Sequence, residues 1–364
     1  MIVLGIESSC DETAAAVLED GRRVRSSIVA SQDAVHAPYG GIVPELASRR
    51  HLEVIVPVVE GALSEARVAL ADLDGIAVTN GPGLVGSLLV GCSLAKSLAY
   101  VHGLPLVGVN HLEGHIYAAS LTDDPPPHPF LALVVSGGHT ALYHAHAPLA
   151  YTLVGETRDD AAGEAFDKVA KLLGLGFPGG PEIERVAKHG SPTAIPFPLA
   201  QMSDQTPDFS FSGLKTAVSL HVKRHGPVDE GKAADIAASF QAAAVKMLVR
   251  KTMKAALRLR VQRLVLTGGV AANTALRDAL AAATAEHGMH LHVPPRHLCT
   301  DNAAMIAAAG TARLLAGERA GLDLNAVPDL ALADESPGAA PARTEKTRQG
   351  GAGGDRLGSP PASR

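Results

Sequence analysis

Two strand–turn–strand units with polar turns constrain the fold more than any other feature of this chain. Residues 2–18 are predicted to form two strands around the polar turn Glu7–Glu12, and residues 130–144 two more around the turn Ser136–His139. Short apolar runs bounded by turn residues are typical of buried strands. Because the same unit opens both halves, the sequence predicts an internal duplication. A two-lobed body of this kind places its ligand in the cleft between the lobes.

Periodic apolar segments elsewhere alternate between strands and helices, which indicates an α/β architecture. Further strands are expected at residues 24–30, 75–79, 105–109, 263–266 and 290–293. Helices are expected at residues 45–64, 233–259, 273–283 and 303–316, with one more that follows the glycine-rich turn 80–87 and ends near Tyr100. Pro57 is predicted to break or kink the first of these helices, because proline lacks a backbone donor.

A proline-rich segment at residues 123–129 separates the two halves. We expect an N-terminal lobe at residues 1–122, with the helix around 303–320 packing back on it, and a C-terminal lobe at residues 129–302. Residues 334–364 are rich in Gly, Pro, Ala and Ser and carry almost no large apolar side chains. Such a segment buries too little surface to offset its chain entropy, so it is predicted to be a disordered tail.

Composition narrows the class of protein. The chain has 364 residues, 46% hydrophobic side chains, 3% aromatic side chains and no Trp, so Ala, Val, Leu and Ile must build its core. A formal net charge of −5 gives no general attraction to nucleic acid. The three scattered cysteines predict free thiols in a reducing, cytoplasmic environment. The N-terminus lacks signal-peptide features, and no apolar run predicts a membrane span.

A pair of histidines suggests a metal site. His111 and His115 are four residues apart, which places both imidazoles on one face of a helix. Two such imidazoles can bind one metal ion, and Asp301 offers a third ligand that leaves coordination positions open for a substrate. With 16 histidines in the chain, the pair alone is equally compatible with ordinary surface or core histidines.

Three turns at predicted strand ends have the composition of phosphate-binding turns: Ser8–Glu12, Ser136–His139 and Thr267–Val270. Glycine lets the backbone approach an anion closely, and a following helix N-terminus adds positive potential. Each turn alone is weak evidence, but three in a duplicated α/β chain favour a phosphate-bearing ligand. The chain has neither a P-loop nor a Gly-x-Gly-x-x-Gly turn after a strand, which argues against those nucleotide folds.

Seven motifs, in order along the chain, resemble those of a single family. They are GIESSCDET (5–13), NHLEGH (110–115), VSGGHT (135–140), GEAFDKVA (163–170), FSFSGLK (209–215), GGVAAN (268–273) and CTDN (299–302). The family is the universal tRNA threonylcarbamoyltransferases, and the chain resembles its bacterial TsaD group from residue 2 to about residue 315. Val134 stands where archaeal and eukaryotic relatives have tyrosine, which places the resemblance in the bacterial branch.

The resemblance implies the ASKHA fold, shared by actin, heat-shock chaperone ATPases and sugar kinases, with two ribonuclease-H-like lobes around a cleft. It also implies an enzyme that transfers the threonylcarbamoyl group of threonylcarbamoyl-AMP to N6 of adenosine 37 in tRNAs reading ANN codons. The products are t6A-modified tRNA and AMP.

Residue roles follow from the same resemblance. His111, His115 and Asp301 match the ligands of one divalent ion per subunit, for which iron (Fe²⁺) is favoured and zinc is compatible. Residues that match the binding site of the acyl-adenylate are Val134, Val135, Ser136, Gly137 and Gly138 for its phosphate and carbamoyl part, and Asp167, Gly180, Glu184 and Asn273 for its ribose and adenine. Without the family, Asp167 could be a cap or could pair with Lys168 or Lys171, Gly180 could be only a turn, and Asn273 could be a helix cap.

The motifs do not fix the general base. Glu12, Asp11 and His139 are candidates in the expected cleft, and Glu12 is our hypothesis because its carboxylate faces the phosphate end.

Contact with tRNA is expected to need partners, because the net charge is negative. A basic run, which could also be a solvated helix face, consists of Lys246, Arg250, Lys251, Lys254, Arg258, Arg260 and Arg263. The resemblance implies two protein partners, a paralogous TsaB-like subunit of the same fold and a small TsaE-like P-loop ATPase.

Three other functions are compatible with part of the pattern. An ATP-dependent kinase or chaperone-like ATPase of the same fold would hold Mg²⁺ with acidic residues and would lack the His/Asp site. A metallopeptidase is disfavoured, because Glu113 does not follow His111 directly and points away from the histidine face. A non-catalytic partner subunit would have no use for the three metal ligands.

Overall fold

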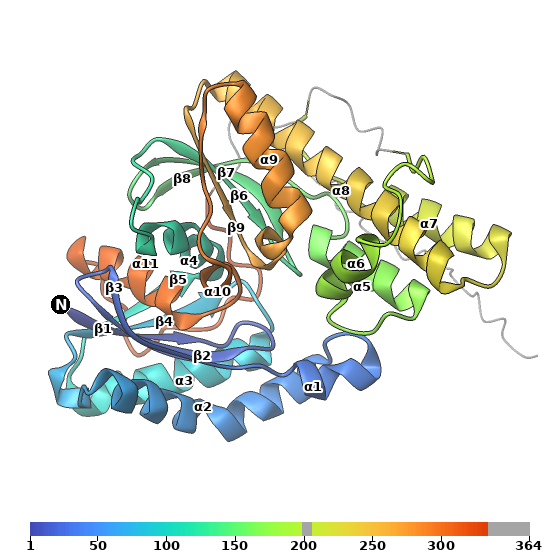
Figure 1. Cartoon of the computed structure of the whole chain (residues 1–364). Helices are drawn as coiled ribbons and strands as arrows, with labels where there is room; N and C mark the ends of the chain where they lie inside the picture. The colour runs from blue at the N-terminus through green and yellow to red at the C-terminus, as the bar shows by residue number, and fades with distance from the viewer. Residues whose placement is uncertain (199–205, 334–364) are drawn as a thin grey trace, which may run out of the picture.

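The computed structural model describes residues 1–198 and 206–333, so the predicted disordered tail lies outside the described residues. The described chain contains two five-stranded sheets, with helices on their outer faces and between them (Figure 1).

The first sheet has the strand order β3-β2-β1-β4-β5. Its strands are β1 (Ile2–Glu7), β2 (Thr13–Glu19), β3 (Arg23–Ala30), β4 (Gly75–Gly81) and β5 (Leu106–Asn110). β1 pairs antiparallel with β2 and parallel with β4, so that Ile6 lies opposite Ala15 on one side and Val78 on the other.

The second sheet repeats this arrangement in the order β8-β7-β6-β9-β10. Its strands are β6 (Phe130–Val135), β7 (Thr140–Ala147), β8 (Ala150–Glu156), β9 (Arg263–Thr267) and β10 (His290–His292). β6 pairs antiparallel with β7 and parallel with β9, as β1 does with β2 and β4. The shared order and pairing confirm the predicted duplicated α/β fold.

Helices cover both faces of each sheet (Figure 1). They are α1 (Asp33–His36), α2 (Pro44–Ala66), α3 (Val85–His102), α4 (His111–Tyr117), α5 (Ala162–Leu173), α6 (Gly179–Ala187), α7 (Ser212–His225), α8 (Glu230–Leu259), α9 (Thr274–Glu286), α10 (Arg296–Cys299) and α11 (Ala303–Leu315). Short 3₁₀ turns occur at Ala37–Tyr39, Leu70–Asp72, Ala118–Leu121 and Gly269–Ala272. Helices α2 and α3 pack on one face of the first sheet and α11 on the other. Helices α5, α6, α8 and α9 pack on one face of the second sheet, and α4 packs on the other.

β1 alternates between the two cores of the N-terminal half. Leu4 and Ile6 contact the α2/α3 side, whereas Val3 contacts the α11 side. Gly5 also faces α11, where an added Cβ would collide with the backbone of Ala303. The absence of a side chain at this position therefore lets the start of α11 approach the strand closely.

Pro57 does not break its helix, which excludes the break that was one of the two predicted effects. α2 runs continuously from Pro44 to Ala66. Pro57 is exposed, while Ile55 and Val58 beside it are buried against the sheet. Apolar burial along the whole helix outweighs the loss of one backbone hydrogen bond.

α3 is the one described helix whose length and composition would suffice to cross a membrane. It packs against β4 and α2. A single helix of this kind is equally typical of the core of a soluble protein.

Candidate functional site

β5 leads directly into α4, which carries the two histidines. Asn110 ends the strand and caps the helix, because its Oδ1 accepts the Leu112 backbone N–H at 2.9 Å. Its side-chain amide donates to the Leu330 carbonyl at 3.0 Å, which anchors this end of α4 to the segment after α11. The buried imidazoles of His111 and His115 follow one turn apart, with ring centroids separated by 4.7 Å.

Asp301 meets these two histidines from a distant part of the chain. It lies between α10 and α11, next to Asn302, which caps α11 by accepting the Met305 N–H. The Asp301 Oδ1 atom is 3.5 Å from His111 Nε2 and 3.2 Å from His115 Nε2. One potential ligand atom from each of the three residues therefore lies within 4.8 Å of the others.

A second carboxylate orients His111. The Nδ1 atom of His111 donates to Glu7 Oε2 at 3.0 Å, so its Nε2 atom faces Asp301. Thr79 Oγ1 donates to the same carboxylate oxygen at 2.6 Å. Metal-binding histidines are typically held in this way, by a carboxylate on the second ring nitrogen. Glu7 was not among the predicted site residues, although a glutamate that ends a buried strand is a sequence signal for such a role.

The hydrogen bonding of His115 indicates whether these three residues fit a metal ion. Both of its ring nitrogens are buried and make no hydrogen bond within the described residues. The 3.2 Å approach of Nε2 to Asp301 is an electrostatic contact without hydrogen-bond geometry. A buried imidazole with two unpartnered nitrogens is unfavourable unless a ligand uses one of them. The two imidazoles and the carboxylate thus fit a divalent ion that accepts nitrogen and oxygen ligands.

The charges in this group reinforce one another. Burial opposes protonation of His111, but the carboxylates of Asp301 and Glu7 raise its pKa to about 9. Burial would raise the pKa of Asp301, yet His111 and His115 hold it well below its ordinary value. Asp301 is therefore ionised at neutral pH.

The turn between β1 and β2 adds two further carboxyl groups. Burial and the charges of Asp301 and Asp11 raise the pKa of Glu12 to about 10, and burial also raises the pKa of Asp11. Interaction between the two carboxyls favours the charged form of Asp11 and the neutral form of Glu12. With Asp33 they form a second group of closely spaced acidic ligand atoms, but acidic side chains cluster so often without an ion that this group supports no assignment.

His139, from a turn of the second sheet, lies near the group formed by His111, His115 and Asp301. It ends the turn between β6 and β7, and burial together with the charges of His111 and His115 lowers its pKa to about 4. Thr267 at the end of β9 adds a direct link, because its Oγ1 donates to the His115 carbonyl at 2.8 Å. The predicted metal ligands and two of the predicted phosphate-binding turns therefore meet at the boundary between the lobes.

The turn after β6 has open space around its two glycines. A Cβ at Gly137 or Gly138 would meet nothing within 4 Å. Ser136 is buried at the base of the turn, and the side chains of Val134 and Val135 are wholly buried in β6. A ligand at this turn would therefore contact mainly backbone groups.

Asp167 holds the start of α6. Its Oδ1 accepts the Gly179 N–H at 2.7 Å, and a Cβ at Gly180 would meet nothing within 4 Å. Burial raises the pKa of Asp167, and the charge of Asp11 from the opposite lobe raises it further. Lys168 pairs with Asp160 and Glu164, and Lys171 donates to the Tyr39 carbonyl, so the ion pairs considered for Asp167 from the sequence are not formed.

Glu184 and Asn273 join α6 to α9. Asn273 caps α9 by accepting the Leu276 N–H at 3.0 Å, and its amide donates to Gln241 at 2.8 Å. Glu184 accepts the next backbone N–H, that of Thr274, at 3.1 Å. Asn273 is therefore a helix cap, and any contact with a ligand comes in addition to that role.

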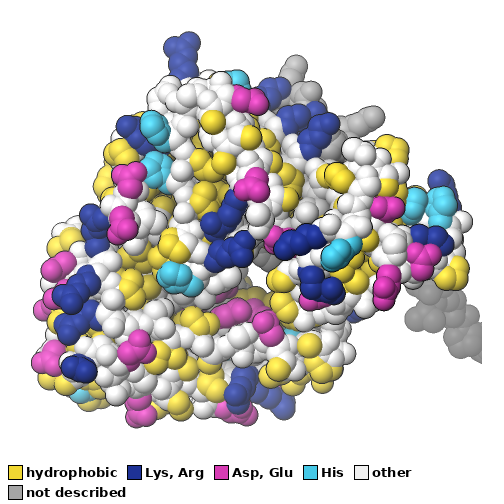
Figure 2. Space-filling view, in the orientation of Figure 1, with side chains coloured by type: hydrophobic (Ala, Val, Ile, Leu, Met, Phe, Trp, Pro, Cys, Tyr) yellow, Lys and Arg dark blue, Asp and Glu magenta, His cyan; other side chains and the backbone are white. Residues whose placement is uncertain are grey.

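The basic run on α8 is not one continuous surface. Lys251 is buried and donates to the Thr206 carbonyl at 2.8 Å, so it cannot contact a macromolecule. Lys246, Lys254 and Arg258 are exposed. Figure 2 shows a hollow between the lobes with Lys and Arg side chains on one side of it and Asp and Glu side chains on the other.

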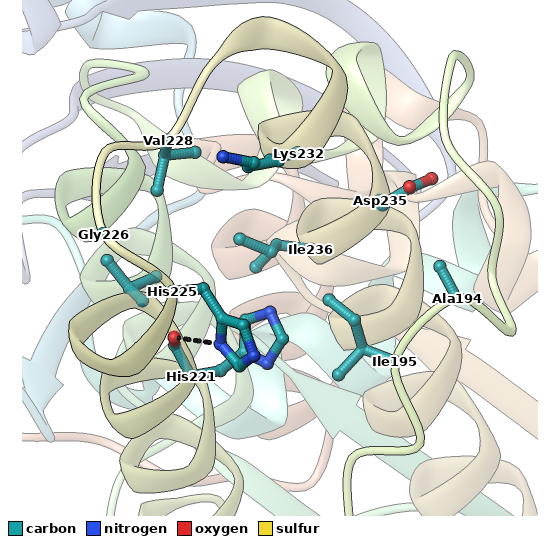
Figure 3. A pocket seen from close by; sticks show the side chains of 10 residues that line it. Ala194, Ile195, His221, His225, Gly226, Val228, Lys232, Asp235 and Ile236 are labelled. Carbon is teal, nitrogen blue, oxygen red and sulfur yellow. Dashed lines mark hydrogen bonds between the residues drawn. The ribbon is translucent and has the colours of Figure 1, made fainter.

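A separate cavity of about 170 Å³ lies between α7 and α8 (Figure 3). Its walls combine apolar residues such as Ile195 and Ile236 with the stacked rings of His221 and His225. None of the predicted site residues lines this cavity, so it is not part of the site between the lobes.

The duplicated sheets and the groups that meet between them define a two-lobed ASKHA-fold protein with a candidate metal site. Component A of (R)-2-hydroxyglutaryl-CoA dehydratase from Acidaminococcus fermentans has a similar fold, with a TM-score of 0.51 and 15% identity over 87% of this chain and 99% of that one. Full-length HypF, in a phosphate- and nucleotide-bound form, gives a TM-score of 0.57 at 13% identity, over 86% of this chain and 46% of that one. At these identities the likeness concerns the fold alone.

Sequence comparison identifies the family. Residues 23–308 match the family described as TsaD, tRNA N6-adenosine threonylcarbamoyltransferase. The enzyme of that name from Anaeromyxobacter dehalogenans is 61% identical over 90% of this chain and 98% of its own length, and that from Symbiobacterium thermophilum is 57% identical over 91% and 97%. The chain belongs to this family of tRNA-modifying transferases, which confirms the resemblance seen in its motifs and the predicted enzyme class.

Proposed function

We propose that this chain transfers the threonylcarbamoyl group of threonylcarbamoyl-AMP to N6 of adenosine 37 in tRNAs reading ANN codons, forming t6A and releasing AMP. The observation that carries this proposal is the His111, His115 and Asp301 group beside the open glycine turn of the opposite lobe. Transfer from an adenylate would use both features, because charge develops on the attacked carbonyl oxygen and on the leaving phosphate of AMP.

We propose His111, His115 and Asp301 as ligands of one divalent ion per subunit, Fe²⁺ by preference and Zn²⁺ as the alternative. When bound, such an ion supplies Lewis-acid polarisation of the carbonyl and a contact for the leaving phosphate. Glu7 keeps His111 in the tautomer whose Nε2 faces Asp301. The burial of both imidazoles shields this side of the site from bulk water.

The adenylate would lie along the C-terminal lobe. Backbone N–H groups of the turn that contains Gly137 and Gly138 would donate hydrogen bonds to its phosphate and carbamoyl oxygens. Asp167 would accept hydrogen bonds from the ribose hydroxyls, because a carboxylate has more acceptor sites than Gly179 uses. Gly180 would allow close approach of the adenine, with Glu184 and Asn273 at its edge.

Glu12 is the base that we propose for removing the proton from N6. A carboxyl group must be ionised to act as a base. Burial and the charges of Asp301 and Asp11 oppose this ionisation, because they raise the pKa of Glu12 to about 10. Positive charge that compensates Asp301 favours the ionised, proton-accepting form. Asp11 and His139 are the other candidates, and the low pKa of His139 makes it a weak base.

We also propose how the protein is organised and partnered in the cytoplasm. The N-terminal lobe would comprise residues 1–122 and 303–320, and the C-terminal lobe residues 129–302, which is supported by the packing of α11 on the first sheet. The exposed apolar side chains of Leu52 and Val56 on α2, and of Val85 and Leu89 on α3, support pairing of the N-terminal lobe with a TsaB-like paralogue. A small TsaE-like P-loop ATPase would complete the assembly that acts on tRNA.

Labelled threonylcarbamoyl-AMP tests the proposal directly. The purified protein, together with its two partner proteins, is expected to transfer the label to an ANN-reading tRNA, and the His111→Ala protein is not. The same tRNA with guanosine at position 37 is the matched control. Label recovered on tRNA that lacks adenosine 37, or equal transfer by both proteins, would refute the proposal.

A further inference from the structure

Glu113 is a buried carboxylate that the proposed reaction does not use. It lies two residues from each ligand histidine, so at about 100° per residue it projects from the opposite side of α4. Its side chain is fully buried. The Arg313 guanidinium of α11 donates to it through Nε at 2.7 Å. Because an uncompensated charge in such a place is strongly unfavourable, a buried pair of this kind needs a physical reason.

The pair joins the two helices that position all three proposed metal ligands. α4 carries His111 and His115, and α11 begins two residues after Asp301. Between these helices, a Cβ at Gly114 would lie 2.6 Å from Ile306 Cδ1, so the two helices are in close contact beside the ion pair. Any slippage of α4 along α11 would therefore change the distance between the imidazoles and the Asp301 carboxylate.

Two neighbouring residues, Glu318 and Tyr151, also lie close to the pair. Arg313 Nη1 donates to Glu318 just beyond the end of α11, at 2.6 Å. Tyr151 from β8, in the second sheet, lies near the Glu113 carboxylate, whose Oε1 atom makes no hydrogen bond within the described residues. Glu318 is half-exposed, whereas Glu113 is wholly buried, so the two carboxylates that share Arg313 differ in how strongly they constrain it.

We propose that the Glu113–Arg313 pair is a positioning device that sets the spacing between the α4 histidines and Asp301. It would thereby raise the affinity of the site for its divalent ion without touching that ion. The inference rests on the proposed metal ligands, but it assigns a role to two residues outside them. Groups that orient metal ligands from behind typically change metal affinity by about 10- to 100-fold when they are removed.

The test measures metal affinity and fold stability separately, on the full chain. Zn²⁺ dissociation constants are measured by competition with a chromophoric chelator, and unfolding temperatures are measured on the metal-free proteins. Glu113→Gln and Arg313→Met are each expected to weaken Zn²⁺ binding by about 10- to 100-fold. Glu318→Gln, which removes the exposed partner of the same arginine, is the matched control and is expected to bind Zn²⁺ like the unaltered protein.

The double variant Glu113→Gln/Arg313→Met separates positioning from stability. It leaves no unpaired buried charge, so its unfolding temperature is expected to return close to that of the unaltered protein. Its Zn²⁺ affinity is expected to stay low, because no hydrogen bond then ties α4 to α11. The visible spectrum of the Co²⁺-loaded double variant is expected to differ from that of the Co²⁺-loaded unaltered protein, because this spectrum reports ligand geometry.

Two outcomes would overturn the inference, and they are distinguishable from failure of the proposed function. If the double variant recovers both stability and Zn²⁺ affinity, the pair is only structural. If the single variants bind Zn²⁺ as tightly as the unaltered protein, the pair does not position the ligands. If the unaltered protein itself binds no Zn²⁺, Co²⁺ or Fe²⁺, the proposed metal ligands are wrong and the inference fails with them.

Discussion

Two turns occupy equivalent places in the duplicated fold and differ completely in chemistry. The turn between β1 and β2 carries Asp11 and Glu12, whose pKa values are raised by burial and by neighbouring carboxylates. The turn between β6 and β7 carries Gly137, Gly138 and a His139 whose pKa is lowered to about 4. The first turn suits uptake of a proton, and the second suits an anion bound by backbone groups. Duplication thus fixes where the two turns meet, and residue type decides what each can bind.

The largest effect is expected from removing His111 of α4, whose Nδ1 contacts the first of these turns at Ser9 Oγ, 3.2 Å away. His111→Ala removes one of three proposed ligands and is expected to lower transfer to tRNA by more than about 100-fold, because loss of a ligand exceeds the effect of losing a residue that orients one. Metal analysis should show the bound ion falling from one per subunit to near zero. His225→Ala, a histidine in the separate cavity between α7 and α8, serves as control and should leave both values unchanged. Full activity in His111→Ala would break the assignment.

Glu12→Gln tests whether the acidic turn also takes up the proton. Glutamine keeps the shape of Glu12 but accepts no proton, so single-turnover transfer is expected to fall by about 100-fold or more. Metal content should not change, since Glu12 is not one of the proposed ligands. An unaltered single-turnover rate in this variant would move the base to Asp11 or His139.

Gly180→Ala tests whether the adenine of the substrate lies against Gly180, on the side of the site that contains the glycine turn. The added methyl group meets no protein atom within 4 Å, so the fold should tolerate it. It enters the space proposed for the adenine and is expected to raise the KM for threonylcarbamoyl-AMP by about tenfold, or about 1.4 kcal/mol, with little change in kcat. Gly163→Ala is the contrasting control, because its Cβ would lie 2.7 Å from the Ser136 carbonyl oxygen and should lower stability instead. An unchanged KM in Gly180→Ala would show that no ligand approaches this glycine.

The smallest effect is expected on stability, from the ion pairs that join α5 and α7 in the C-terminal half. Asp160 pairs with Lys168 of α5 and Lys215 of α7, at 2.8 and 2.6 Å. Burial would raise the pKa of Asp160, but the two lysines lower it. Its stabilising contribution is therefore fully present above its ordinary pKa near 3.8 and is lost as the pH falls through the lower folded-state pKa.

Asp160→Asn is accordingly expected to lower the free energy of unfolding by about 1 kcal/mol at pH 7, and by less as the pH falls below about 4. Urea unfolding at several pH values measures the difference. Glu164→Gln, which removes the more exposed partner of Lys168, should have a smaller effect. A difference for Asp160→Asn that does not depend on pH would mean that the ion pairs contribute nothing.

Local pattern predicted most of the fold, and contacts between distant segments account for the rest. The hairpins around both polar turns, the strands that flank them and the long α8 follow from periodicity and turn residues. β8 and the helices α5 to α7 were not predicted, although α5 and α6 are short and strongly amphipathic, so their periodicity was a signal that was missed. A break at Pro57 was one of two predicted effects, because the sequence shows the lost donor but not the burial of Ile55 and Val58 on either side of it.

Local sequence patterns also predicted only part of the candidate site. The spacing of His111 and His115 places both on one helix face, and the structure brings Asp301 to them from more than a hundred residues away. Glu7 and Glu113 were missed as parts of this arrangement, because their contacts with His111 and Arg313 join segments that no local pattern connects. Lys251 was grouped with surface cations because nothing in its sequence neighbourhood reveals its burial.

The dependence of transfer on metal occupancy tests the central claim most directly. Protein stripped of metal and reloaded with increasing Fe²⁺ or Zn²⁺ is assayed for single-turnover transfer to tRNA. The rate should rise in proportion to occupancy, reach its maximum at one ion per subunit, and stay near zero in His115→Ala at every metal concentration. Transfer at full rate by the metal-free protein would contradict the account.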